Sequence, residues 1–223
     1  MKEKMVFFAA MVLLALGTVH TQKNIDRYPF NAQESILYLP SGQYLKPLAL
    51  GYNEMFADLL WIKTISYFGS HFMADKEYPW LYPMLTLIID LDPRFDFPYY
   101  FGGIVLSLEA NQVNNANQIL ARGIESYSEK WEYPFYIGVD HYYREGDPKQ
   151  ALPFLERAAT LPGSPEFLKS LIGSLYLKTE GREHALAFFR EAYRNTQDDM
   201  IRKRISAKIE QILSESAFND TGD

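Results

Sequence analysis

From Gly51 onward, apolar residues recur at intervals of three and four positions, which is the period of an amphipathic helix. Met55, Leu59 and Ile62 follow this spacing on one side, and Trp61 belongs to a second apolar side. A helix that is apolar on more than one side is expected to lie between neighbouring helices. No stretch of this region shows convincing strand alternation, so the pattern predicts an all-α domain.

Proline and serine place the ends of several predicted helices. A first pair is predicted at about 52–70 and 78–91, and Pro93 follows it as a stop signal. Pro162 closes a later helix, and Ser164 is a candidate N-cap for the next one.

The last predicted helix runs from about 198 to 213. Ile201, Ile205 and Ile209 fall on one face, and most of the basic residues lie off it. This is typical of a capping helix with one face on a helical array and one face in water. Residues 214–223 are predicted to be disordered.

Three segments repeat the same spacing of small residues. Ala116, Ala151 and Ala185 lie 35 and then 34 residues apart, each followed by a large residue four positions later. Small residues allow two antiparallel helices to approach closely, and the bulky residue is expected to fill the gap to the next pair. The aligned sets are Gly103, Leu106, Ala116, Leu120 and Gly123; Gly138, His141, Ala151, Leu155 and Ala158; and Gly173, Tyr176, Ala185, Phe189 and Ala192.

This pattern resembles the tetratricopeptide repeat (TPR) family. Ile172-Gly173-x-x-Tyr176, with the small and aromatic residues after it, matches the family's signature, and Gly146-Asp147-Pro148 matches its turn between helices. The resemblance covers about 95–197 and, more weakly, 51–94. It implies a right-handed solenoid of antiparallel helix pairs.

The chain departs from the family in three respects. The first two units carry one extra residue between the glycine and the alanine. His141 stands where the family usually has an aromatic residue, and Gly123 replaces the second alanine.

The N-terminus has the pattern of an export signal. Lys2 and Lys4 precede an apolar run over residues 5–19, which places the rest of the chain outside the cytoplasm. As a helix the run spans about 22 Å, whereas the hydrocarbon core of a bilayer is roughly 30 Å thick. An anchor of this length therefore requires the bilayer to thin locally or the flanking side chains to snorkel to the interface. We predict an uncleaved single-pass anchor in the inner (cytoplasmic) membrane, with the domain on the outer, periplasmic side. The alternative is a periplasmic or secreted protein, released by cleavage after Gly17.

These observations divide the chain into five parts. A signal anchor or transmembrane segment at 1–22 is followed by a proline-broken linker at 23–50. We expect the linker to pack on the domain, because Ile36, Tyr38 and Leu39 would otherwise be left in water. The remaining parts are a divergent helical cap pair at 51–94, TPR-like repeats with a C-terminal capping helix at 95–213, and the tail at 214–223.

Composition narrows the classes of function. The net charge of −6 argues against nucleic-acid binding, which requires a basic face. The absence of cysteine excludes disulfides, thiolate catalysis and cysteine-based zinc sites. No H-E-x-x-H, G-x-S-x-G, P-loop or dinucleotide motif occurs. We therefore predict a non-enzyme with no cofactor and no metal.

Two clusters offer alternative chemistry. Asp140, His141 and the adjacent Tyr142-Tyr143 suggest an enzyme or enzyme subunit, which predicts a deep pocket with a carboxylate facing His141. A packed structural histidine is the expected role at this repeat position. Asp90, Asp92 and Asp96 lack the spacing of a calcium loop, and helix termination explains them better.

The resemblance also implies a binding surface, because in that family the first helix of each pair lines a concave groove. Residues three before, one after, and four and five after each glycine tend to face it. An apolar and aromatic groove can hold a helix or an extended peptide, unless the chain's own 20–50 segment fills it. The positions selected are Tyr100, Ile104, Ser107 and Leu108, then Phe135, Val139, Tyr142 and Tyr143, then Ser170, Ser174, Leu177 and Lys178.

The predicted function is a non-enzymatic, membrane-tethered scaffold or adaptor that binds another protein or peptide. Resemblance implies a role in assembling an envelope complex, such as a pilus or secretion machine. The alternatives are a soluble exported repeat protein that binds a peptide or small apolar ligand, and the enzyme subunit described above.

Overall fold

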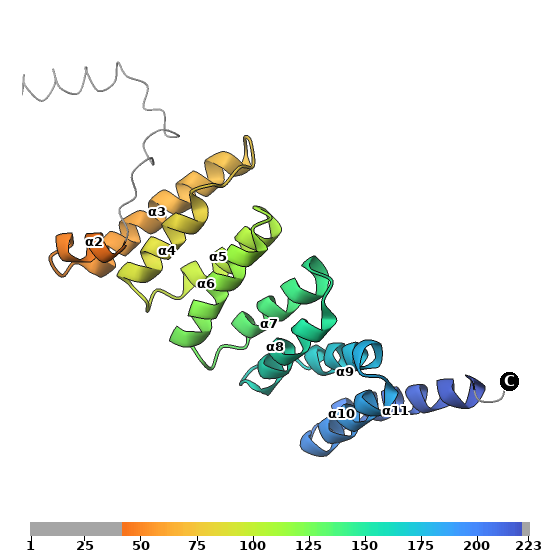
Figure 1. Ribbon diagram of the computed structural model, residues 1–223. Helices are drawn as coiled ribbons and strands as arrows, with labels where there is room; N and C mark the ends of the chain where they lie inside the picture. Colours follow the sequence, from red (N-terminus) through yellow and green to blue (C-terminus); the bar gives the residue numbers. More distant parts are fainter. Residues whose placement is uncertain (1–41, 220–223) are drawn as a thin grey trace, which may run out of the picture. The chain divides into compact units, whose positions relative to one another are not determined.

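A computed structural model describes residues 42–219, except the side chains of residue 43 and of 215–219, and every regular element in it is helical (Figure 1). The all-α prediction is therefore confirmed for these residues. The elements are α2 (Gly42–Leu48), α3 (Asn53–Phe72), α4 (Leu81–Leu91), α5 (Phe97–Leu108), α6 (Val113–Ser126), α7 (Glu132–Val139), the π-helical turn η1 (Asp140–Arg144), α8 (Pro148–Thr160), α9 (Phe167–Thr179), α10 (Arg182–Asn195) and α11 (Asp199–Asn219).

The predicted membrane anchor at 1–22 lies outside the described residues, as do positions 23–41 of the predicted linker and the last four residues of the tail. Among residues 42–219, no helix is both long enough and apolar enough to cross a membrane.

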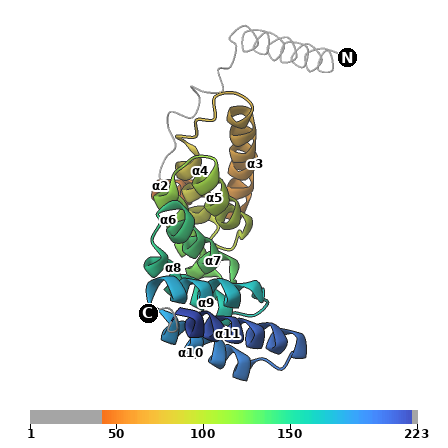
Figure 2. The same cartoon turned by 90° about the vertical axis from the view of Figure 1, so that its right-hand side faces the viewer.

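The helices pack in pairs that follow the order of the chain. α3 packs with α4, α5 with α6, α7 with α8, and α9 with α10 (Figures 1 and 2). Successive pairs meet where α4 contacts α5, α6 contacts α7, and α8 contacts α9. α11 closes the series by packing on α10, where Ile205 and Ile212 join the core of Leu186 and Phe189.

Glycines allow the close approach of the two helices within a pair. A Cβ atom placed on Gly103 would lie 2.4 Å from Leu120, and one on Gly138 would lie 2.7 Å from Leu155. On Gly173 it would lie 2.0 Å from the ring of Phe189. The expected close approach is confirmed, with one difference in detail. The bulky residue of the second helix covers the glycine of its own pair, rather than only filling the gap to the next pair.

The extra residue of the second repeat is accommodated at the end of α7. There the Glu145 N–H donates to the Asp140 carbonyl five residues back, 3.1 Å away, instead of four residues back as in an α-helix. This π-helical turn takes up one residue without breaking the pair. Asp147 then caps α8, because its carboxylate accepts from the N–H groups of Lys149 (3.1 Å) and Gln150 (3.0 Å).

Four boundaries differ from those predicted. The end of the predicted linker forms the short helix α2, which packs on α4, and Gly42 begins this helix instead of a turn. α4 begins at Leu81, three residues after the predicted start. α9 begins at Phe167, and Ser164 is not its N-cap, because the Ser164 hydroxyl donates to the Ala159 carbonyl (3.1 Å). α11 continues to Asn219, so 214–219 are helical where a disordered tail was predicted.

Candidate functional site

Aromatic rings connect the first helices of successive pairs. Tyr100 on α5 and Tyr136 on α7 meet edge to face, with ring centroids 5.6 Å apart and hydroxyl oxygens 3.2 Å apart. Phe135 contacts Tyr136 at 5.2 Å and reaches Phe167, at the start of α9, at 5.9 Å. We call these four residues the aromatic row. Tyr100 and Phe167 are exposed, so the row presents aromatic surface to solvent across three helix pairs.

The Tyr136 hydroxyl of the aromatic row stays neutral at physiological pH. Burial and the hydrogen bond with Tyr100 raise the pKa of Tyr136 to about 12. A neutral phenol can both donate and accept a hydrogen bond, and its ring offers a large contact area. The row can therefore bind apolar side chains and polar backbone groups together.

A second group gathers where η1 meets α9. The Lys178 ammonium donates to the Tyr142 hydroxyl, 2.8 Å away, and lies 5.3 Å from the centroid of the same ring. The rings of Tyr142 and Tyr143 are 4.5 Å apart, and Tyr143 is 68% exposed. We call these three residues the tyrosine–lysine cluster. The hydrogen bond to Tyr142 raises the pKa of Lys178, so the cluster carries a positive charge.

The other predicted groove residues differ in their exposure. Ile104 and Val139 are half-buried on α5 and α7, and Leu108 is exposed at the end of α5. Leu177 packs against the core of α10 and α11, so its side chain contributes to packing. Within the described part of the chain, no ring contact joins the aromatic row to the tyrosine–lysine cluster.

The sequence-based selection omitted Tyr136 and Phe167. The sequence does carry a signal for Tyr136: Tyr100 and Tyr136 are 36 residues apart, each two positions after a proline, Pro98 or Pro134. An alignment on Gly103 and Gly138 uses a spacing of 35 and therefore places Tyr136 out of register. Phe167 has no comparable signal, because its position depends on where α9 begins.

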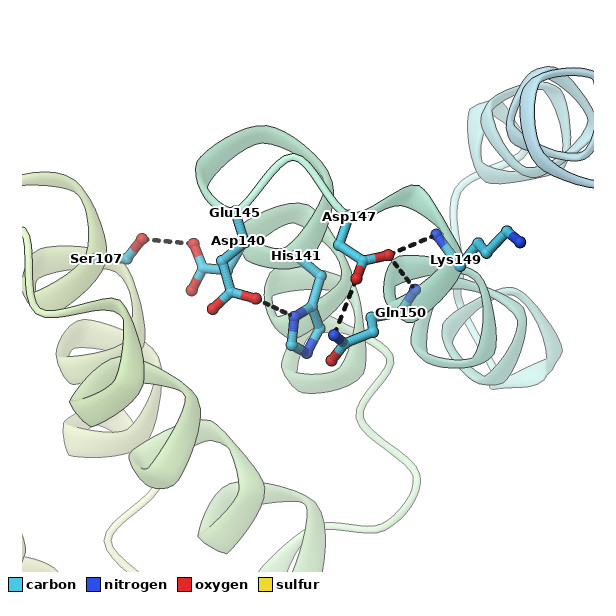
Figure 3. Close-up of polar contacts among 7 residues, drawn as sticks. All are labelled: Ser107, Asp140, His141, Glu145, Asp147, Lys149 and Gln150. Carbon is cyan, nitrogen blue, oxygen red and sulfur yellow. Dashed lines mark hydrogen bonds and ion pairs between the residues drawn. The ribbon is translucent and has the colours of Figure 1, made fainter.

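A buried carboxylate belongs to the same turn, η1, as Tyr142 and Tyr143. Asp140 is only 4% exposed, and its Oδ1 accepts a hydrogen bond from the Ser107 hydroxyl on α5 at 2.5 Å (Figure 3). Its Oδ2 is buried and has no hydrogen-bond partner in the described part of the chain. Arg144 donates to the Ser107 carbonyl (3.2 Å) and to Asn111 Oδ1 (2.5 Å), which ties η1 to α5 a second time.

Burial raises the pKa of Asp140, although the Ser107 hydrogen bond and the Arg144 charge oppose this rise. Ser107 was selected as a groove position, but it is 2% exposed, so its hydroxyl serves this buried contact instead. The contact fixes η1 on α5 and thereby positions Tyr142 and Tyr143, which belong to the same turn.

The His141 side chain points away from the Asp140 carboxylate and contacts other residues. Its Nδ1 lies 2.6 Å from Oε2 of Glu145 (Figure 3). Its ring stacks on Phe154 with centroids 5.3 Å apart. Both residues of the His141–Glu145 pair line an open depression of about 460 Å³ between α6 and α8, together with Asn117 and Arg157. The enzyme alternative predicted a deep pocket with a carboxylate facing His141; the carboxylate is present, and the hollow beside it is open.

The three aspartates considered as a cation site each have another partner. Asp90 accepts from Arg122 (2.7 Å), Asp92 accepts from the Arg94 N–H (2.9 Å), and Asp96 accepts from Lys130 and the Tyr133 hydroxyl. In residues 42–219, no group of three or more histidine, aspartate or glutamate residues is placed to hold a metal ion.

Comparison with protein-family models and with curated proteins finds no match to this chain.

Proposed function

We propose that this chain is a non-enzymatic scaffold that binds a peptide or another protein along the first helices of consecutive pairs. The observation that carries the proposal is the exposed aromatic row, formed by residues of α5, α7 and α9. A surface shared by several helix pairs suits a ligand longer than one pair. The pairwise packing and the 34–35-residue spacing support a right-handed, tetratricopeptide-like solenoid as its framework.

The chemistry of the surface favours a peptide with apolar side chains. Tyrosine and phenylalanine lose little side-chain entropy on binding and give large contact areas, which is why aromatic residues dominate binding hot spots. The hydroxyls of Tyr100 and Tyr136 add hydrogen-bonding groups for a peptide backbone. The positive charge of Lys178 favours a carboxylate on the peptide near the tyrosine–lysine cluster.

Removing the tyrosine–lysine cluster is expected to weaken partner capture. In the variant Tyr142→Ala plus Tyr143→Ala, we expect at least about a tenfold loss of crosslinked partner, since aromatic hot-spot residues typically contribute more than 1 kcal/mol each. A photocrosslinking residue at position 100 is used in intact membranes, and the adducts are quantified by blotting and mass spectrometry.

Tyr193→Ala provides the matched control. Tyr193 is an exposed tyrosine that also lies against a cation, Arg202 at 5.7 Å, but it belongs to α10, a second helix. Its variant is expected to retain the adducts of the wild type. Equal amounts of the same adducts in all three proteins would show that Tyr142 and Tyr143 do not contribute to binding, and would remove the tyrosine–lysine cluster from the proposed surface.

We further propose that residues 5–19 tether the scaffold to the inner membrane, with the repeats on the periplasmic side, where it assembles an envelope complex. The basic start and the apolar run support this. Sequencing the N-terminus of the mature protein tests the tether, and we expect the initial segment to be retained. A mature protein beginning at Thr18 would instead make the chain a soluble exported protein.

An enzyme subunit is the second candidate, and the His141–Glu145 pair favours it. A carboxylate 2.6 Å from an imidazole is the arrangement that orients a general base. The open shape of the neighbouring depression and the stacking of His141 on Phe154 favour a packing role. We therefore place the scaffold first.

A further inference from the structure

A cavity lies at the point where the aromatic row ends. Phe167, the last residue of the row, lines a partly enclosed cavity of about 160 Å³ between α9 and α11. Phe189, which is only 1% exposed, and Ile201 of α11 line it as well. An apolar cavity of about 150 Å³ is large enough to hold a benzene-sized group. The cavity can therefore take one apolar side chain of a bound peptide.

Three basic side chains also line this cavity. Lys169 comes from α9, whereas Arg204 and Lys208 are neighbours one turn apart on α11. Lys169 is paired with Glu166, 3.0 Å away, whose carboxylate lines the cavity too. Lys208 donates to the neutral side chain of Gln211 at 3.1 Å, and Arg204 belongs to no ion pair within the described residues. The lining thus carries an excess of positive charge.

This positive charge is local, because the chain as a whole has a net charge of −6. A guanidinium presents its N–H groups in a planar fork that matches the two oxygens of a carboxylate. Charges at the edge of a binding surface attract a ligand of opposite charge and select against one of like charge. The complement of this cavity is therefore an apolar side chain with an acidic residue beside it.

We propose that the bound peptide is acidic where it meets α11: an apolar side chain enters the cavity, and a neighbouring aspartate or glutamate pairs with Arg204 and Lys208. The inference rests on the proposed function, because it takes the peptide to lie along the aromatic row. Phe167 belongs both to the row and to the cavity lining, so the two surfaces are continuous.

Selection from a random peptide library tests the composition of the ligand. Short peptides displayed on phage are selected on the full chain in detergent, as wild type and as Arg204→Glu plus Lys208→Glu. We expect the wild type to enrich peptides in which an acidic residue lies close to an aromatic or aliphatic one. The variant is expected to enrich apolar residues as before and to lose the preference for acidic ones, because its cavity edge is negative.

Affinity measurements then test the charge contact itself. The most enriched wild-type peptide is synthesised with a fluorescent label, and its Kd is measured by anisotropy. Arg204→Glu is expected to raise this Kd about tenfold or more, because two negative charges then face each other. Replacing the acidic residue of the peptide with lysine is expected to bring the Kd for this variant back to within about threefold of the wild-type value.

Lys203→Glu is the matched control. It makes the same change of charge at the neighbouring position of α11, on an exposed residue that does not line the cavity. Its Kd for the peptide is expected to stay within about threefold of wild type. Arg204 is exposed as well, so both variants are expected to keep the helical content and thermal unfolding of the wild type.

The outcomes distinguish this inference from the proposed function. Selected peptides without acidic residues, or a Kd that Arg204→Glu leaves unchanged, would overturn the inference while peptide binding itself stands. An equal loss with Lys203→Glu would also overturn it, because general attraction between charges would then explain the preference. A wild type that selects no peptide would overturn the proposed function and this inference with it.

Discussion

Replacing Gly173 with alanine is expected to lower the free energy of unfolding by about 1–3 kcal/mol, the usual effect of overpacking a filled core. The new Cβ would lie 2.0 to 2.7 Å from three carbon atoms of the Phe189 ring, which is 1% exposed. A rigid buried ring cannot move aside as the end of a flexible chain can. The higher helix propensity of alanine, about 1 kcal/mol, only partly offsets the clash. Urea unfolding followed by circular dichroism measures the change.

The background variant Phe189→Ala isolates the cause. Removing the ring alone is expected to lower stability by about 3–5 kcal/mol, because it leaves a cavity in the core. In that background Gly173→Ala is expected to be neutral or slightly stabilising, since the ring atoms it would meet are gone. A loss from Gly173→Ala that is the same with and without Phe189 would show that the ring is not what excludes a side chain at this position.

Replacing Ser107 with alanine is expected to lower the free energy of unfolding by about 1–3 kcal/mol at neutral pH, the effect of leaving a buried group without its hydrogen bond. Asp140 would lose the hydroxyl that donates to its Oδ1, while its Oδ2 is already without a partner in the described part of the chain. A buried carboxylate with neither oxygen paired is unfavourable. Urea unfolding at pH 7 measures this loss.

The pH dependence follows from the direction of the shift. Burial raises the pKa of Asp140 in the folded state above its ordinary value of 3.8. Ionised Asp140 therefore disfavours the folded state above the folded pKa, and this contribution disappears as the pH falls towards 3.8. We expect the loss caused by Ser107→Ala to shrink over the same range. In an Asp140→Asn background, the loss caused by Ser107→Ala should be small and independent of pH. In the wild-type background, a loss that is the same at every pH would contradict the role assigned to Ser107.

Much of the packing could be predicted from the sequence, because small residues impose it locally. Gly103, Gly138 and Gly173 each face a bulky residue of the partner helix 16 or 17 positions later, and no other part of the chain is needed to deduce this. The helix pair predicted at 52–70 and 78–91 could be recognised from other local signals, apolar periodicity and a following proline.

The contacts that join one pair to the next were predictable only in part. Tyr100, Phe135, Tyr142 and Lys178 were selected by their register, and the structure brings them into two surface groups. Register errors of one residue suffice to misplace a side chain by about 100° around a helix. That explains why Tyr136 was omitted. Ser107 lies four positions after the reference glycine of its own repeat, and it is buried because α5 contacts Asp140 there.

The partnership of Ser107 and Asp140 could not be deduced from their positions. It depends on how α7 packs against α5, a contact between helices of different pairs that no local spacing in the sequence specifies. Asp140 itself continues α7 with α-helical backbone angles, and the π-helical turn follows it. An aspartate beside a histidine and two tyrosines suggested chemistry, whereas the carboxylate is bonded to the neighbouring helix pair.

The contacts between helices are all made within a short distance along the chain. The most extensive helix contacts in the described part of the chain join elements one or two places apart, and the ion pair of Arg94 with Glu54 spans 40 residues. Contacts between residues so near in the sequence form quickly, because little chain entropy is lost in forming them. During synthesis, a helix pair can therefore pack as soon as its own residues have emerged, and it then forms a surface on which the next pair assembles. A nascent chain of this design exposes at most one unfinished apolar face at a time.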